Sequence, residues 1–175
     1  MLTFCNKSLF VAVLMGAVLL VPPALAASGV TTSTSPQTKS TASYVFKLSI
    51  GMSEKMWTPA QVRAKHPRTG EVMLIGSMAG AMSMGGSQRH VEVHITSRAT
   101  GKVVMGAHPT ISAIDTNMKN AMTIKVPVAV MQGVMTGSAD LHYGNNVDLV
   151  AGHMYKVRIS LKGERAVFQM QAPKA

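Results

Sequence analysis

The sequence predicts an all-β fold, a single immunoglobulin-like β-sandwich that follows a cleaved signal peptide. Three observations carry this prediction: short runs that alternate apolar and polar residues, turn residues between these runs, and little sequence of helical period. The length of 175 residues leaves room for one domain after a leader is removed. We therefore expect about six to eight short strands in two packed sheets.

Residues 1–26 have the three parts of a secretory signal peptide. A short polar start, with Lys7 as its only charge, is followed by the apolar run 9–21 and then by small residues that end at Ala26. The apolar run is shorter than the roughly 20 residues that a membrane-spanning helix needs, so we expect cleavage after Ala26. The sequence therefore predicts export across the inner membrane to the periplasm, and the single Cys5 is lost with the signal peptide.

Residues 27–42 are rich in serine and threonine and have no apolar periodicity. This composition cannot bury a core, so it predicts a disordered leader. The β-sandwich domain is then expected to span residues 43–175.

The chain is strongly basic, with 17 lysine and arginine residues against seven acidic residues and a formal net charge of +10. Loss of Lys7 leaves 16 basic residues, which are scattered rather than clustered. Scattered charge indicates a generic basic surface, and export makes nucleic acid an unsuitable partner. An acidic protein or an anionic membrane surface stays open as a partner.

The alternation of apolar and polar residues predicts where most of the strands lie. Residues 123–130 alternate, and Pro127 within them indicates an edge strand or a bulge. Two paired strands are predicted near the C-terminus, joined by a turn at Gly163. The other expected elements are a strand over 44–50, a helical turn within 53–66 that Ser53 caps and Pro67 ends, an apolar run over 71–75, and the C-terminal pair 154–161 and 166–171.

The segment 89–96 alternates strictly and predicts a strand with an apolar face and a polar face. The polar face carries His90, Glu92 and His94, which are two imidazoles and a carboxylate. Adjacent members lie about 6.7 Å apart along a strand and can converge on one ion, whereas His90 and His94 are about 13 Å apart. By itself, such a face is equally consistent with the solvated side of a sheet.

Methionine is abundant, and 13 of the 15 methionines follow Ala26. Met78, Met82 and Met84 lie in the glycine-rich stretch 76–87, which is expected to be a loop. Thioether sulfur prefers Cu(I), but methionine also fills hydrophobic cores. The loop therefore offers ligands to a soft ion or covers one end of the sandwich.

A segment near the C-terminus resembles a known family. Six residues separate Met135 from His-Tyr-Gly-x-Asn (142–146), and Gly-x-x-Tyr-Lys-Val (152–157) follows. This pattern, with His-x-Glu on an earlier strand, is similar to the periplasmic copper-binding proteins that accompany a bacterial high-affinity iron permease. The resemblance implies an immunoglobulin-like sandwich, often a homodimer. It also implies a copper ion, Cu(I) or Cu(II), held by His90, Glu92, Met135 and His142.

The chain departs from this family in one respect that concerns the site. The family has a further histidine near its C-terminal end, whereas this chain has none after His153. Met82, Met84 and His94 are the candidates for the vacant ligand position.

We do not expect an enzyme. After the leader there is no thiol and no glycine-flanked nucleophilic serine, and the chain has no phosphate-binding or dinucleotide loop. The sequence predicts a periplasmic metal-binding protein that takes copper and assists iron or copper uptake or homeostasis, with an inner-membrane metal permease as a partner. The alternative is an exported basic interaction module that binds an acidic partner or an anionic membrane surface without metal.

Overall fold

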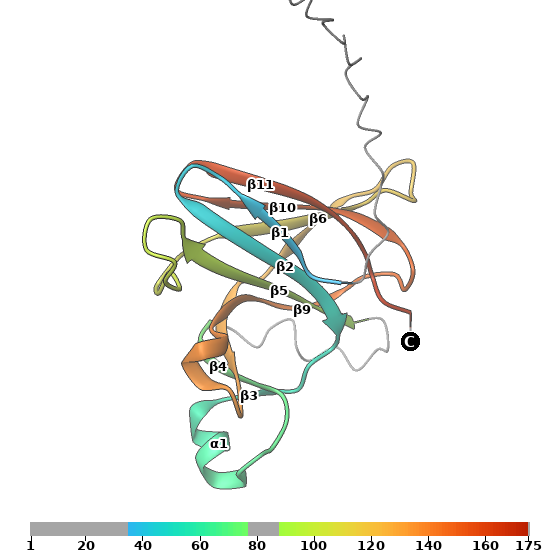
Figure 1. Ribbon diagram of the computed structural model, residues 1–175. Helices are drawn as coiled ribbons and strands as arrows, with labels where there is room; N and C mark the ends of the chain where they lie inside the picture. Colours follow the sequence, from blue (N-terminus) through green and yellow to red (C-terminus); the bar gives the residue numbers. More distant parts are fainter. Residues whose placement is uncertain (1–34, 77–87, 175) are drawn as a thin grey trace, which may run out of the picture.

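Two β-sheets packed face to face form the domain in the computed structural model, which describes residues 35–76 and 88–174 (Figure 1). Every pairing of neighbouring strands is antiparallel except that of β3 with β4. The larger sheet has the order β1 (Gln37–Ser40), β2 (Tyr44–Met52), β5 (Gln88–Ser97), β9 (His142–Asp148), β8 (Ala129–Gly133), β4 (Glu71–Ile75) and β3 (Met56–Trp57). The smaller has the order β11 (Glu164–Gln171), β10 (Met154–Leu161), β6 (Thr110–Asp115) and β7 (Thr123–Val126).

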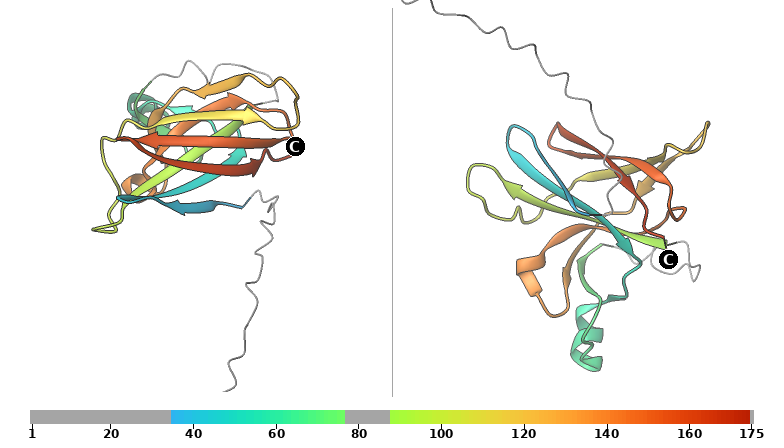
Figure 2. Two further views of the ribbon diagram at one scale, coloured as in Figure 1. Left: turned by 90° about the horizontal axis from the view of Figure 1, so that it is seen from above. Right: turned by 45° about the vertical axis from the view of Figure 1, so that its right-hand side comes forward.

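The predicted all-β sandwich is confirmed. Seen from above, the strands of the smaller sheet lie across β2 and β5 of the larger sheet (Figure 2). The core between the sheets holds every second residue of the central strands, as the alternation predicted. The strands expected over 44–50, 71–75 and 89–96 are present, and the C-terminal pair forms β10 and β11 in direct register.

The domain begins earlier than predicted, because β1 lies within the segment 27–42 that was expected to be disordered. Strand β1 is an edge strand whose residues are mostly exposed, so it needs no apolar alternation. It pairs with β2 and also contacts β11, where the side chain of Gln37 donates to the carbonyl oxygen of Gln169 at 2.7 Å. The proposed signal peptide, residues 1–26, lies outside the described residues.

The helical turn expected within 53–66 is present as α1 (Pro59–Lys65), but its cap is Thr58 rather than Ser53. The Thr58 hydroxyl accepts from the backbone N–H of Gln61, whose side chain in turn accepts from the Thr58 N–H, and Pro59 occupies the first turn. The chain before Thr58 is extended because β3 pairs there with β4.

Residues 123–130 are not one strand, contrary to the prediction. The alternation continues through Pro127, but the chain leaves one sheet after β7 and enters the other at β8. Proline cannot donate to a strand ladder, which agrees with a break at this position.

A second, smaller hydrophobic cluster lies on the outer side of the larger sheet. It consists of Met56, Met73, Ala129 and Met131, all buried, beside the segment that contains α1. Among the residues that the structure describes, no helix combines the length and the apolar character needed to cross a membrane.

Candidate metal centre

Neighbouring strands bring polar side chains together on the outer face of the larger sheet. Strand β5 turns its apolar residues into the core, so His90, Glu92 and His94 lie on the other face. Strand β9 pairs with β5 and places Gly144 opposite Glu92. His142 lies two residues before Gly144 and therefore shares this outer face.

Four residues of this face each offer one ligand atom, and these atoms lie within 4.8 Å of one another: Glu92, His94, Asp140 and His142. Asp140 comes from the 3-10 helix η2 (Gly137–Asp140) between β8 and β9. Its Oδ2 accepts from the Gly133 N–H at 3.2 Å and from the Thr136 hydroxyl at 3.1 Å. These bonds leave Oδ1 facing His94 Nε2 at 3.8 Å.

The protonation of His142 is fixed by its hydrogen bond. Nδ1 lies 2.7 Å from the backbone carbonyl oxygen of Asp140, which can only accept, so Nδ1 carries the proton. Nε2 then carries a lone pair, and it has no hydrogen-bond partner among the described residues. The His142 side chain is fully buried, with 0 % exposure. Burial lowers the pKa of His142, so the imidazole is neutral at neutral pH, which is the form that binds metals.

His90 presents a second lone pair beside the first. Asn146 is held by Glu54, whose N–H donates to Asn146 Oδ1 and whose carbonyl accepts from Asn146 Nδ2. Oδ1 is therefore the atom that faces His90 Nδ1 at 3.0 Å, and Nδ1 must donate. The buried Nε2 of His90 has no partner in the described chain, and burial together with the nearby His142 lowers the pKa of His90 to about 4.

The imidazoles of the site are neighbours. The ring centroids of His90 and His142 are 5.7 Å apart, and those of His94 and His142 are 5.4 Å apart. His94 differs from the other two, because its Nε2 lies 2.6 Å from Glu92 Oε1. A carboxylate oxygen accepts, so a proton sits between these two groups, and the hydrogen bond to Glu92 raises the pKa of His94.

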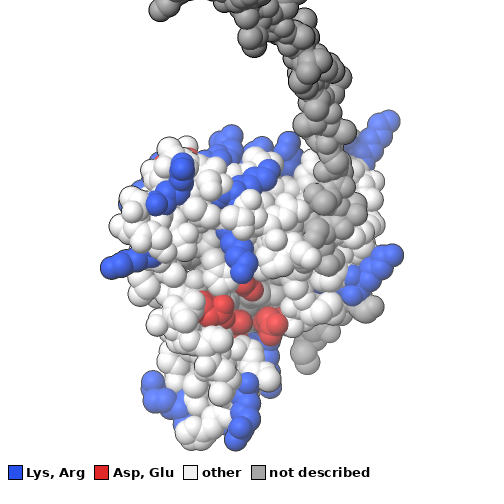
Figure 3. All heavy atoms as spheres, viewed as in Figure 1, with Lys and Arg blue, Asp and Glu red and all other residues white. Residues whose placement is uncertain are grey.

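Four of the seven acidic residues of this basic chain gather at the site: Glu54, Glu71, Glu92 and Asp140. Figure 3 shows acidic side chains gathered in one patch between the sandwich and the part that holds α1. Burial and the neighbouring carboxylates raise the pKa of Glu71 to about 7. Its buried Oε2 has no hydrogen-bond partner among the described residues and lies 3.6 Å from His142 Nε2.

Glu92 responds differently to the same surroundings. Burial acts to raise its pKa, but the hydrogen bond from His94 and the nearby imidazoles outweigh burial, and the pKa falls to about 2. Glu92 is therefore ionised, while the lone pairs of His90 and His142 point into the same region. Buried acceptors without donors are costly, so this constellation is one that a cation would stabilise.

The structure brings three of the four expected ligands together. His90, Glu92 and His142 share the patch, although His90 lies outside the tightest group of four. Met135 lies in the turn after β8 with 73 % of its surface exposed, and it lines a depression of about 320 Å³ together with Glu71 and Asp140. Met135 thus lies at the rim of the site, and its role as a ligand stays a prediction.

Sequence reasoning did not select Asp140, Glu71 or Met131. Asp140-x-His142 repeats the two-residue spacing of His90-x-Glu92, which was a usable signal. Met131 pairs directly with His142 across β8 and β9, so its fully buried side chain shares the outer face. His94, a candidate for the vacant position, is one of the four grouped residues, whereas the candidates Met82 and Met84 lie outside the described residues.

Comparison with family models, curated proteins and solved structures found no match to this chain. What the site can bind therefore follows from its own donors, which are imidazole nitrogens and carboxylate oxygens with buried thioethers nearby.

Proposed function

We propose that this protein is a non-enzymatic metal-binding protein that holds one copper ion at the outer face of its larger sheet. The observation that carries the proposal is the group of four ligand atoms within 4.8 Å from Glu92, His94, Asp140 and His142. The Nε2 atoms of His90 and His142 beside this group support it, because they have no hydrogen-bond partner among the described residues and buried polar atoms are normally paired.

The donor chemistry favours copper over harder ions. Imidazole suits copper and zinc, whereas sites for magnesium or calcium consist of oxygen ligands. Two imidazoles and two carboxylates suit Cu(II), which binds mixed nitrogen and oxygen sites more tightly than the other divalent metals of its row. A thioether would favour Cu(I), and Met131 beside His142 and Met135 at the rim are the nearby sources.

Binding of the ion should release a proton. His94 can donate its Nε2 to a metal only when the proton it shares with Glu92 has left. Because Glu92 raises the pKa of His94 above its ordinary value of 6.5, protons compete with the metal up to neutral pH. The affinity for Cu(II) should therefore fall as the pH falls from 8 to 6, and calorimetry in buffers of different ionisation enthalpy should report the released proton.

We further infer that the protein holds or delivers its ion outside the cytoplasm, which the signal-peptide pattern of residues 1–26 supports. A metal permease of the inner membrane is the partner that this role would require.

The test is a titration of the purified metal-free protein with Cu(II), Cu(I) and Zn(II). His142→Ala should weaken Cu(II) binding by more than about 100-fold. Loss of a residue that only hydrogen-bonds to a metal ligand already lowers metal affinity by about 10–100-fold, and loss of the ligand itself should cost more. Asp140→Asn should act in the same direction. His108→Ala is the matched control, since His108 is exposed and does not belong to the group of ligand residues.

Two results would contradict the proposal. One is equal affinity for Cu(II) in the wild type, His142→Ala and Asp140→Asn proteins. The other is tighter binding of Zn(II) than of Cu(II), which would keep a metal centre but remove copper. Met135→Ala separates the two thioether positions, because a loss confined to Cu(I) would assign Met135 as a ligand of the reduced ion.

A further inference from the structure

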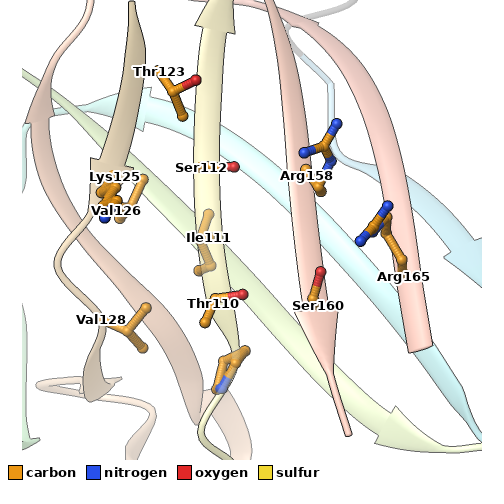
Figure 4. Close-up of a pocket in the computed structure, with 11 residues that line it drawn as sticks. Thr110, Ile111, Ser112, Thr123, Lys125, Val126, Val128, Arg158, Ser160 and Arg165 are labelled. Carbon is orange, nitrogen blue, oxygen red and sulfur yellow. The ribbon is translucent and has the colours of Figure 1, made fainter. Parts of the chain in front are cut away.

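The smaller sheet carries a groove on its outer face, on the opposite side of the sandwich from the metal centre. The groove has a volume of about 610 Å³. Three cations line it, Lys125 on β7, Arg158 on β10 and Arg165 on β11 (Figure 4). Hydroxyl side chains of Thr110, Ser112 and Ser160 lie between them.

Strand register explains why this face is hollow. Ser112 of β6 is paired on one side with Lys125 and on the other with Arg158, so a small residue stands between two long ones. In the next row, Ser160 is paired with Arg165. The small hydroxyl residues form the floor, and the long basic side chains form the rims.

Within residues 35–76 and 88–174, no ion pair joins Lys125, Arg158 or Arg165 to a carboxylate. Glu164 precedes Arg165 in the chain, but it accepts a hydrogen bond from the Ser43 N–H at 3.0 Å and does not line the groove. None of the residues that line the groove is acidic. The described residues that line the groove therefore carry a net positive charge.

The spacing of the cations indicates the size of an anion that would fit. Arg158 is paired with Val167, so Arg165 is its diagonal neighbour, about 7–8 Å away. Lys125 lies two strands from Arg158, about 10 Å away. A single carboxylate or phosphate group cannot reach all three, whereas the volume of the groove lies in the range of sites for small molecules with several such groups.

The chemistry of the lining argues against a membrane surface as the occupant. Insertion into a bilayer uses exposed large apolar side chains. None of the exposed large hydrophobic residues of the described chain lines the groove. Paired guanidinium groups with neighbouring hydroxyls instead match carboxylate or phosphate oxygens.

We propose that the groove formed by Lys125, Arg158, Arg165 and the hydroxyls of β6 and β10 binds a small organic anion that carries two or three carboxylate or phosphate groups. Arg158 and Arg165 hold one anionic group, and Lys125 holds a second. This site is independent of the metal centre, because the core of the sandwich separates the two faces.

Calorimetric titration of the EDTA-treated, metal-free protein tests the proposal, with citrate and pyrophosphate as probes and acetate as the monovalent control. We expect citrate or pyrophosphate to bind and acetate not to bind. Arg158→Gln and Arg165→Gln should each weaken binding by about tenfold, the loss of a charged hydrogen-bonded contact. Lys156→Gln is the matched control, because Lys156 is exposed on the same strand but does not line the groove.

Several results would overturn the proposal. Equal weakening by Lys156→Gln and Arg158→Gln would indicate diffuse attraction to a basic surface. Binding to vesicles of anionic phospholipid, with no binding of citrate or pyrophosphate, would assign the face to a membrane. Retained anion binding in His142→Ala is expected, whereas its loss would show that the probes bind at the metal centre. Lys156→Gln, Arg158→Gln and Arg165→Gln change exposed side chains, whereas His142→Ala changes a buried one. The thermal midpoint of each variant shows whether it is folded.

Discussion

Gly144→Ala should both destabilise the protein and weaken metal binding, because β5 leaves no room for a Cβ atom at this position beside the site. Gly144 is paired with Glu92 and lies two residues after His142. A Cβ atom at position 144 would lie 1.8 Å from the carbonyl oxygen of Val91 and 2.9 Å from its carbonyl carbon. Both obstacles are backbone atoms of the neighbouring strand, so no side-chain rotation relieves the overlap.

The magnitude follows from this geometry. Overpacking a buried position costs about 1–3 kcal/mol where side chains can adjust, so a clash with backbone should reach about 3 kcal/mol. For a domain of this size each kcal/mol lowers the melting temperature by about 2–4 °C, which gives a loss of roughly 10 °C. Separation of the two strands also moves His142 away from Glu92, so Cu(II) affinity should fall even where the variant is folded.

Gly51→Ala is the matched control. Gly51 lies on β2, paired with His90 on the other side of β5, and a Cβ atom there meets nothing within 4 Å. Its unfolding free energy should stay within about 0.5 kcal/mol of the wild type. Thermal and urea denaturation of the metal-free proteins measure both effects. A difference of about 1–2 °C in melting temperature corresponds to about half a kcal/mol. If Gly144→Ala and Gly51→Ala melt within about 1–2 °C of each other, strand β5 does not exclude a Cβ atom at position 144 and the prediction is wrong.

Two further predictions concern the core and its edge. Tyr143→Phe should lower the unfolding free energy by about 1–3 kcal/mol in urea denaturation. The phenol hydroxyl donates to the Val104 carbonyl and accepts from the Ala107 N–H, so both backbone groups lose a partner in the variant. An unchanged urea midpoint would contradict this prediction. Burial acts to raise the pKa of Asp115, but its hydrogen bonds, which include one from His153, outweigh burial and lower the pKa below 3.8. The ionised Asp115 therefore stabilises the folded protein above pH 3.8, and this stabilisation is lost as the pH falls through the pKa of Asp115 in the folded state. Asp115→Asn should be less stable than the wild type at pH 6, and the difference should shrink toward pH 3.

The strands that sequence reasoning predicted correctly share one property: each buries every second residue against the other sheet. The segment 89–96 is the clearest case, and its two faces are those that alternation assigned. Strand β1 was missed because an exposed edge strand is held by backbone hydrogen bonds, which leave no apolar pattern. The break at Pro127 was misread because alternation continues on both sides while the chain changes sheets.

The site was only partly predictable, for a related reason. Local spacing identifies His90 and Glu92, since residues two apart on a strand share a face. It does not reveal that β8 and β9 pair on this side of β5, which brings Asp140 and Met131 to the same place. Long-range register is set by the whole core rather than by any short motif. Met135 was selected by its spacing from His142, but the turn after β8 leaves it at the surface.

The distribution of charge argues for ligands on both faces of the sandwich. A chain with 17 basic residues has enough lysine and arginine to neutralise all seven acidic ones, yet four carboxylates gather beside three imidazoles, of which two are buried. Burial and the neighbouring carboxylates raise the pKa of Glu71 to about 7, so this arrangement disfavours its own negative charge. On the opposite face, three cations surround small hydroxyls without a carboxylate among them. A bound cation on one face and a bound anion on the other would each offset the local excess of like charge and stabilise the folded state through mass action.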